Sequence, residues 1–371
     1  MTNQELAELI FPDTKLNKDD YEKKYPVRNL QQEARVTRFA PSPTGFVHIG
    51  NFFQALISYI NAKNTEGIFY LRNEDTDKKR EKEGAVELIL ETLDHYEISP
   101  DEYELNNKVY GNYEPYIQSK RKELYRTFAK YLIEIGRAYP CFCTSEELSN
   151  LRELQTKDKA RTGYYGKYAK CRNLSNGEIA KKIRLGIPYV IRFKSEGNFS
   201  NKFIFKDLVR GTIEFPENDF DIIILKSEDQ LPTYHFAHVI DDHFMRTTHV
   251  VRGEEWLSSV PVHIEMFEAM GWAPPKYIHN PLILKKDGES LRKISKRKDP
   301  EASMKYFEEK GYPPETIIDS LMTIINSNFE DWRRANPIED FRDFKFNPQK
   351  MNSSGALYSL DKLDNMSKNY I

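Results

Sequence analysis

The segment from Arg35 to Ile60 constrains the fold more than any other part of the chain. Residues 35–40 predict a short strand, and apolar side chains then recur at three- and four-residue steps over residues 49–60, which predicts a helix. Two prolines stop the strand, and Gly45 and Gly50 allow the turn to approach a ligand closely. Such a strand–turn–helix unit is typical of an open α/β sheet, whose ligands bind beyond the carboxyl ends of the strands.

The turn offers a place for phosphate but is not a P-loop. Its two glycines have the P-loop spacing, yet Asn51 and Phe52 stand where Lys and Ser or Thr are required. The start of the following helix favours an anion, because its N–H groups are unpaired. His48 lies beside this turn and is either a ligand contact or a helix cap.

Composition restricts the class of protein. The chain has 371 residues, a formal net charge of −2 and three cysteines. An odd, low cysteine count argues against a disulfide framework and for a reducing compartment, and the acidic N-terminus is unlike a secretory signal. No apolar run is long enough to span a membrane, so we expect a cytoplasmic protein without a membrane partner. Any nucleic-acid surface must be a local basic patch, because the overall charge is nearly balanced.

Charged residues follow several predicted strands. The strand over residues 67–72 runs into Glu74, which can hold an ammonium group, and Asp77 is expected to cap the next helix. Arg38 and Arg252 stand near the ends of two other strands, where two guanidinium groups can clamp a carboxylate or form surface ion pairs. Residues 220–225 are almost continuously apolar, which predicts a return to the buried parallel sheet, so that residues 120–219 form an insertion.

Two further segments suggest ligands. Cys141, Cys143 and Cys171 either bind zinc, which needs a close thiolate pair and a fourth ligand, or are ordinary thiols. Residues 284–298 contain seven Lys or Arg around an Asp-Gly turn. A mobile basic loop of this kind can follow charge developing on a phosphate, and the alternative is a solvated loop or an RNA-backbone contact.

Taken together, these motifs resemble those of the glutamyl-tRNA synthetase family of class I aminoacyl-tRNA synthetases. The turn from Arg38 with His48-Ile-Gly-Asn51 is similar to the family's HIGH-type signature, and Lys293-Ile-Ser-Lys-Arg297 is similar to its KMSKS signature. The residues from Glu74, Asp207, Pro232, Asp241 and Val251 onward match other family motifs in the family's order.

The resemblance implies a fold and a division of the chain. The fold is α/β, with a Rossmann-like parallel sheet, an inserted α+β acceptor-binding domain and a mostly helical, C-terminal stem-contact domain. The expected units are an N-terminal extension, 1–34; the two halves of the catalytic domain, 35–119 and 220–284; the insertion, 120–219; and the KMSKS-type loop with the stem-contact domain, 285–371. We also expect the helical anticodon-binding domain to be absent, in a truncated or a short natural form.

The resemblance further implies glutamate–tRNA ligase activity in a monomer. Its substrates are ATP with Mg²⁺, L-glutamate and tRNA(Glu), and members of the family generally need tRNA before they activate glutamate. The residues implied to be catalytic are His48, Lys293 and Lys296. Those implied to bind ATP are Pro43, Thr44, His48, Gly50, Asn51, Glu255 and Lys296. Those implied to bind glutamate are Arg38, Ala40, Ser42, Glu74, Tyr234, His238 and Arg252.

Several alternatives stay open at this point. Zinc-binding relatives have a further His or Tyr, but Asn173 stands where the His is expected, and Tyr168 is the nearest candidate for a fourth ligand. The chain could also be one of two other kinds of protein. One is a short paralogue that glutamylates a modified tRNA base, and the other is a non-catalytic paralogue that binds tRNA. The sequence does not decide whether tRNA for glutamine is also charged.

Overall fold

A parallel sheet lies at the centre of the molecule. The computed structural model describes residues 1–79 and 81–368. In the first part of the sheet β1 (Val36–Phe39) pairs in parallel with β2 (Ile68–Leu71), and α3 (Ile49–Lys63) connects them. The predicted strand–turn–helix is therefore confirmed. His48 caps α3, since its Nδ1 accepts a hydrogen bond from the Gly50 amide at 3.0 Å.

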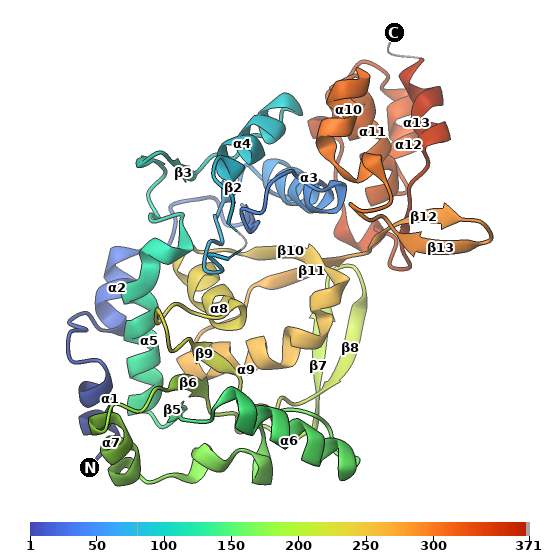
Figure 1. Cartoon of the computed structure of the whole chain (residues 1–371). Coiled ribbons are helices and arrows are strands. Elements are labelled where there is room, and N and C mark those ends of the chain that lie inside the picture. Colours follow the sequence, from blue (N-terminus) through green and yellow to red (C-terminus); the bar gives the residue numbers. More distant parts are fainter. Residues whose placement is uncertain (80, 369–371) are drawn as a thin grey trace.

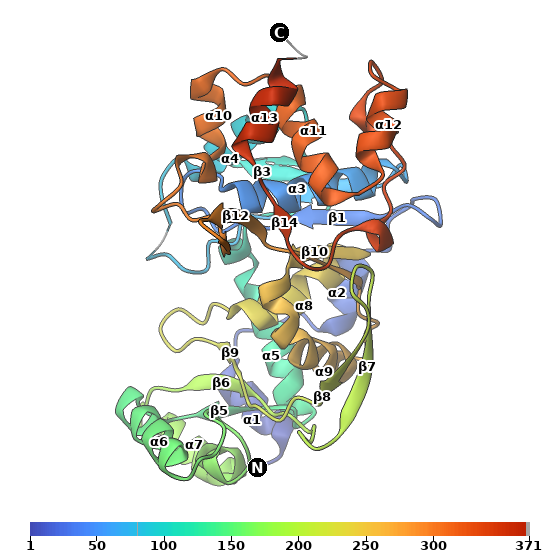
Figure 2. The same ribbon diagram turned by 90° about the vertical axis from the view of Figure 1, so that its right-hand side faces the viewer.

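The second part of the sheet continues from the first. β10 (His249–Gly253) pairs in parallel with β11 (Lys276–Asn280), and it meets β1 where the Thr248 amide donates to the Val36 carbonyl at 2.9 Å. The helices α8 (Tyr234–Phe244) and α9 (Val260–Met270) lie beside these strands (Figures 1 and 2). All five residues of β10 are buried, as a strand covered on both faces requires.

The chain returns to this sheet through a different strand from the one predicted. β7 (Lys202–Asp207) pairs in parallel with β11 and antiparallel with β8 (Gly211–Pro216). The apolar segment 220–225 instead contains β9 (Ile223–Leu225), which pairs antiparallel with β6 (Val190–Phe193). The predicted placement of that segment in the parallel sheet is therefore wrong. A continuous apolar run indicates burial, but it does not indicate the pairing partner.

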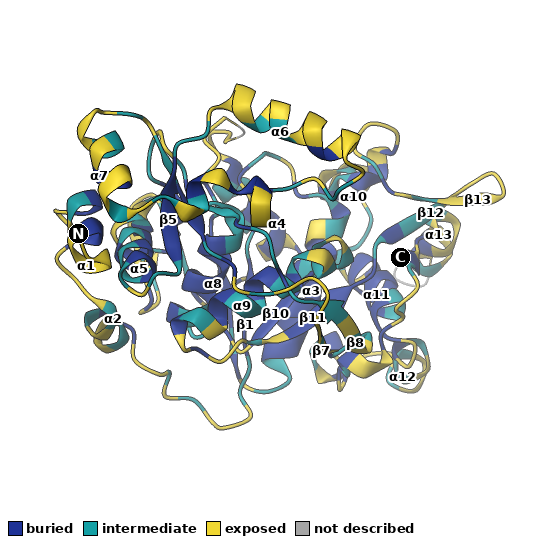
Figure 3. Ribbon diagram, turned by 90° about the horizontal axis from the view of Figure 1, so that it is seen from below, coloured by how far each residue is buried: buried dark blue, intermediate teal, exposed yellow. Residues whose placement is uncertain are grey.

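A smaller α+β layer lies below the main sheet in Figures 1 and 2. Its strand order is β5-β6-β9, and both pairings are antiparallel. Figure 3 shows α6 as largely exposed, in contrast to the buried strands at the centre. The remaining elements of this layer are α5 (Lys122–Glu134), β5 (Ala138–Cys141), α6 (Ser145–Lys157) and α7 (Asn176–Arg184).

The C-terminal part is mostly helical and packs on α3, at the top of Figure 2. A basic hairpin connects it to the sheet, and β14 pairs in parallel with the first strand of that hairpin. Three residues of the unit expected over 285–371 lie outside the described part. Its elements are β12 (Ile283–Asp287), β13 (Ser290–Lys293), α10 (Met304–Lys310), α11 (Pro314–Ile325), α12 (Phe329–Ala335), β14 (Ala356–Leu357) and α13 (Leu360–Ser367).

The N-terminal extension contains two helices. α1 (Asn3–Ile10) packs against α5, and α2 (Lys18–Lys24) lies near the end of α8. Glu22 on α2 contacts His243 and Arg246, each at 2.7 Å. The extension therefore holds the end of the helix that carries Tyr234 and His238.

Three short elements complete the description. α4 (Ala85–His95) begins after Gly84, so Asp77 is not its cap, contrary to the prediction. β3 (Tyr103–Leu105) and β4 (Lys108–Tyr110) form a small hairpin. No helix within residues 1–79 and 81–368 combines the length and apolar character that a membrane crossing requires.

Candidate active site

A cavity of about 850 Å³ opens at the carboxyl ends of β1, β2 and β10. The sheet places it there because the strands are parallel and end at the same edge. It brings together most residues predicted to bind glutamate and several predicted to bind ATP. These are Arg38, Ala40, Ser42, Thr44, Asn51, Glu74, Tyr234, Arg252 and Glu255.

A small second cavity adjoins the first beside the glycine turn. His48, Gly50, Asn51, Glu255 and Lys293 line it. Burial, together with the charges of Lys296 and Lys293, lowers the pKa of His48 to about 4, so the ring is neutral at pH 7. His48 therefore caps the helix and faces this cavity at once, which joins the two roles that the sequence left open.

Lys296 reaches the same turn from the basic hairpin. Its Nζ donates to the Phe46 carbonyl at 3.1 Å. Partial burial of its ammonium group and the nearby charge of Lys82 lower its pKa below the usual value, although the residue as a whole is exposed. The base of the hairpin is held more firmly, because Arg292 makes two hydrogen bonds of 2.6 and 2.7 Å with the buried Asp299.

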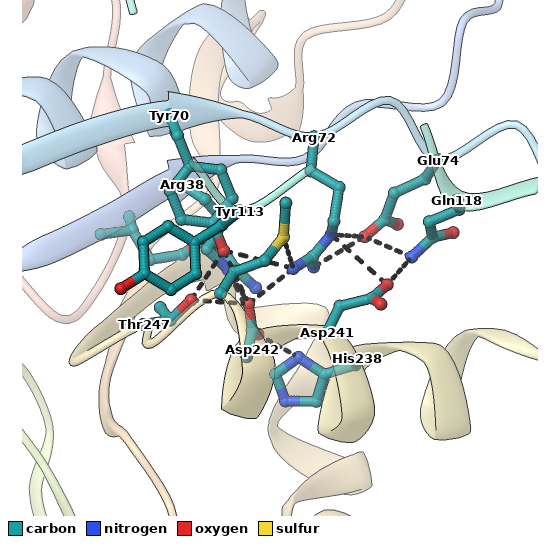
Figure 4. Close-up of polar contacts among 12 residues, drawn as sticks. Arg38, Tyr70, Arg72, Glu74, Tyr113, Gln118, His238, Asp241, Asp242 and Thr247 are labelled. Atoms are coloured by element: carbon teal, nitrogen blue, oxygen red, sulfur yellow. Dashed lines mark hydrogen bonds and ion pairs between the residues drawn. The ribbon is translucent and has the colours of Figure 1, made fainter. Parts of the chain in front are cut away.

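A buried ionic network forms the wall behind the cavity (Figure 4). Arg72 lies between Glu74 at 3.0 Å and Asp242 at 2.7 Å, and Arg38 contacts Asp242 at 3.1 Å. Although burial opposes ionisation, Arg38 and Arg72 hold the pKa of Asp242 well below its usual range. Each of these charged groups is thus paired with a group of opposite charge.

Asp241 is a further carboxylate of this network. It accepts hydrogen bonds from Arg121 at 2.7 Å and from Gln118 at 2.8 Å, and both oxygens contact the Tyr125 hydroxyl. Three guanidinium groups therefore face three carboxylates, and the charges balance.

Arg252 differs from the other arginines of the site. It is 3% exposed and lines the cavity, yet no carboxylate lies within 4.0 Å of it in the described part of the chain. Its guanidinium donates to His279 at 2.9 Å, to His263 at 3.1 Å and to the Trp256 carbonyl at 3.4 Å. A buried cation without an acid is costly, and an anionic ligand would relieve that cost.

Glu74 and Tyr234 line the same cavity as Arg252. Burial raises the pKa of Glu74, although Arg72 opposes the shift and bonds one of its oxygens. Tyr234 packs on Trp256 with ring centroids 4.1 Å apart, which fixes its position.

His238 does not line the cavity, contrary to its predicted role as a glutamate contact. Both ring nitrogens are engaged, with Asp242 at 2.7 Å and with the Tyr277 hydroxyl at 2.9 Å. The side chain is fully buried behind Tyr234. Pro43 and Lys296 also lie outside the two sets of lining residues.

The three cysteines converge, but the nearest tyrosine is not the predicted one. The three sulfur atoms lie within 4.8 Å of one another. The Tyr164 hydroxyl lies 3.5 Å from the Cys141 sulfur and 3.3 Å from the Cys143 sulfur, whereas Tyr168 donates to Asp158 at 3.0 Å. The structure thus places Tyr164, rather than Tyr168, beside the sulfur atoms, because spacing along a loop does not fix the direction of a side chain.

Sequence reasoning also missed several residues of the site. Arg72 carried a signal, since it ends an apolar strand just before Glu74. His263 and His279 carried none, because each lies in an ordinary amphipathic or apolar segment and meets Arg252 only in the folded chain.

Comparison with known proteins decides the family. Residues 35–338 match the model of the class I tRNA synthetases for glutamate and glutamine, catalytic domain. The chain belongs to this family. The synthetase is 51% identical to a glutamate–tRNA ligase of Clostridium perfringens strain 13, over the whole chain and 68% of that relative. It is 49% identical to the glutamate–tRNA ligase of Acetivibrio thermocellus, again over 68% of the relative.

A solved structure agrees with the sequence matches. The glutamate tRNA ligase of Elizabethkingia meningosepticum, in complex with its amino acid, superposes with a TM-score of 0.80 at 33% identity. The match covers 91% of the synthetase and 70% of that chain. The expected α/β class I fold is thereby confirmed, and the synthetase spans about two thirds of the length of its relatives.

Proposed function

We propose that this chain activates glutamate with ATP and transfers it to the 3′ end of tRNA(Glu). The relatives carry the name glutamate–tRNA ligase, and the chain keeps the motifs of both class I signatures. The observation that carries the specificity for glutamate is the buried Arg252 at the cavity, without an acidic partner in the described residues.

In the first step the α-carboxylate of glutamate attacks the α-phosphate of ATP, and pyrophosphate leaves. Mg²⁺ arrives with ATP and neutralises phosphate charge. In the second step a hydroxyl of the terminal ribose attacks the acyl carbon, and AMP leaves. No side chain forms a covalent bond to the substrate, so catalysis depends on positioning and charge stabilisation.

The proposed roles follow the positions of the residues. Arg252, Arg38 and Tyr234 hold the side-chain carboxylate of glutamate, and Glu74 holds the ammonium group, with Ala40 and Ser42 alongside. Pro43, Thr44, His48, Gly50, Asn51 and Glu255 hold ATP, and Lys293 and Lys296 hold its phosphates. The presence of most of these groups around two adjoining cavities supports this assignment.

The decisive experiment is ATP–pyrophosphate exchange with glutamate or glutamine, with and without tRNA(Glu). Exchange that requires both glutamate and tRNA is the expected result. Exchange without tRNA would instead indicate a base-modifying paralogue. No exchange with tRNA present, in a protein that still binds tRNA, would favour a non-catalytic role.

We further propose that Cys141, Cys143, Cys171 and Tyr164 hold a structural zinc ion. Three sulfur atoms and a phenolic oxygen in contact with two of them form a donor set suited to Zn²⁺, which would join the end of β5 to the loop before α7. Metal analysis should give about one zinc per chain. Tyr164→Phe should lower the midpoint of chelator-induced unfolding, whereas Tyr168→Phe should leave it unchanged.

Compartment and assembly complete the proposal. We propose a monomer that acts in the cytoplasm, since free cysteines suit a reducing compartment. Sedimentation at several protein concentrations tests the monomer.

A further inference from the structure

The groups around Arg252 are arranged in a row across three neighbouring strands. Arg252 on β10 stands directly opposite His279 on β11, and Asp207 lies at the end of β7 on the far side of β11. The His279 Nδ1 lies 2.6 Å from Asp207, and the Arg252 Nε lies 2.9 Å from the His279 Nε2. The imidazole ring therefore separates the guanidinium from the nearest carboxylate of this row.

A second branch comes from the helices. His263 on α9 lies 3.1 Å from a terminal nitrogen of Arg252, and its other nitrogen lies 2.9 Å from the Nδ1 of His235 on α8. Both His263 and His279 have no exposed surface.

The hydrogen bonds allow one consistent assignment of protons. A guanidinium can only donate, so the His279 Nε2 and the His263 Nδ1 must both accept. His279 then donates from Nδ1 to Asp207, and His263 donates from Nε2 to His235. Burial, with the nearby charge of Arg252, holds the pKa of His263 well below its usual value. Burial also lowers the pKa of His279, although Asp207 opposes the shift.

We propose that His263 and His279 are positioning residues that select glutamate over glutamine by fixing Arg252 without neutralising it. Arg38, in the same cavity, is held in the other way, by a carboxylate: its Nε donates a hydrogen bond to Asp242. A guanidinium held by neutral acceptors keeps its full charge for the substrate carboxylate. The amide of glutamine offers no charge and presents N–H groups to a side chain that cannot accept them.

This inference rests on the proposed function, and a matched pair of variants tests it. His263→Asn keeps an acceptor close to the position of Nδ1, and His263→Asp places a carboxylate there, so the two differ by one charge. We expect His263→Asn to raise the KM for glutamate less than about fivefold. His263→Asp should raise it about 100-fold, with kcat nearly unchanged and a smaller preference for glutamate over glutamine.

A stability measurement separates this effect from misfolding. Without glutamate, His263→Asp should melt at or above the temperature of His263→Asn, because its new carboxylate pairs with Arg252. Glutamate should raise the melting temperature of His263→Asn and not that of His263→Asp. Equal glutamate KM values for the two variants would overturn the inference.

A second pair decides the matter if neither variant folds. His279→Gln keeps an acceptor near the position of Nε2, and His279→Leu removes it. The KM for glutamate should rise at least about tenfold more in His279→Leu, and equal values would contradict the role. A wild-type enzyme without glutamate-dependent exchange would instead contradict the proposed function.

Discussion

The two ends of the cavity, for which we propose binding of the amino acid and of the phosphates, are built in opposite ways. At the amino-acid end, Arg38, Arg72 and Glu74 belong to a buried network in which each charge has a partner, and Arg252 is fixed by neutral groups. At the phosphate end, the exposed Lys296 makes one hydrogen bond to a backbone carbonyl. The amino-acid end is suited to recognising a ligand of fixed shape. The phosphate end is suited to stabilising charge whose position changes during the reaction.

This contrast accounts for the different tasks that we propose for similar cations. A rigid, dry set of donors distinguishes two substrates that differ by a single charge. Stabilising pyrophosphate as it departs needs a side chain that can change its position, because the leaving group moves away from the α-phosphate.

The largest effect is expected when a paired charge of the amino-acid end is removed. Arg72→Met leaves Glu74 and Asp242 short of a cation in a buried site, which should lower the free energy of unfolding by about 3–5 kcal/mol. Arg252→Met loses only hydrogen bonds to neutral groups and should change it by less than about 1 kcal/mol, while raising the KM for glutamate. Urea unfolding measures the free energy of unfolding of both variants. Equal losses of this free energy would contradict the proposed division between paired and unpaired arginines.

The phosphate end should show the reverse pattern. Lys296→Ala should cost about 2–4 kcal/mol of transition-state stabilisation in adenylate formation, while the free energy of unfolding stays unchanged. Single-turnover formation of the adenylate, measured with tRNA present, tests the kinetic part. Lys298→Ala, in the same exposed loop, is the control and should retain the wild-type rate. An unaltered rate in Lys296→Ala would remove Lys296 from the mechanism.

A smaller effect is expected from pH. Burial lowers the pKa of His235 and His249 to about 4 and that of His238 to about 3, so between pH 6.5 and 4.5 the unfolded chain binds more protons than the folded one. The free energy of unfolding should therefore fall as the pH falls through this range, by up to about 1.4 kcal/mol per pH unit for each histidine.

The variant His249→Gln isolates one of these groups away from the cavity. It should reduce the slope of unfolding free energy against pH below 6.5 and leave the free energy at pH 8 nearly unchanged. A slope equal to that of the wild type would show that His249 is protonated in the folded state.

The sequence predicted the parts of the fold that depend on neighbours along the chain. The strand–turn–helix around Gly45 and the strand with Arg252 near its end are both present. Each follows from local periodicity and turn chemistry, which act over a few residues. Most of the residues that these local motifs singled out line one of the two cavities.

Contacts between distant segments could not be predicted in this way. Tertiary packing decides that β7, and not β9, joins the central sheet. It also places Tyr164, rather than Tyr168, beside the cysteines and His279 beside Arg252. An apolar strand pairs equally well in either sheet as far as its own residues show, and a tyrosine in a loop can point to either side.

The position of β7 has a consequence for how the protein is made. This strand lies in the catalytic sheet only through β11, whose last residue is Asn280, so the row from Asp207 to Arg252 cannot form until the ribosome has released that residue. The proposed glutamate site is therefore assembled late in synthesis, whereas the unit of β1, α3 and β2 is available within the first 71 residues. A nascent chain would acquire the turn proposed to bind ATP long before it could recognise an amino acid.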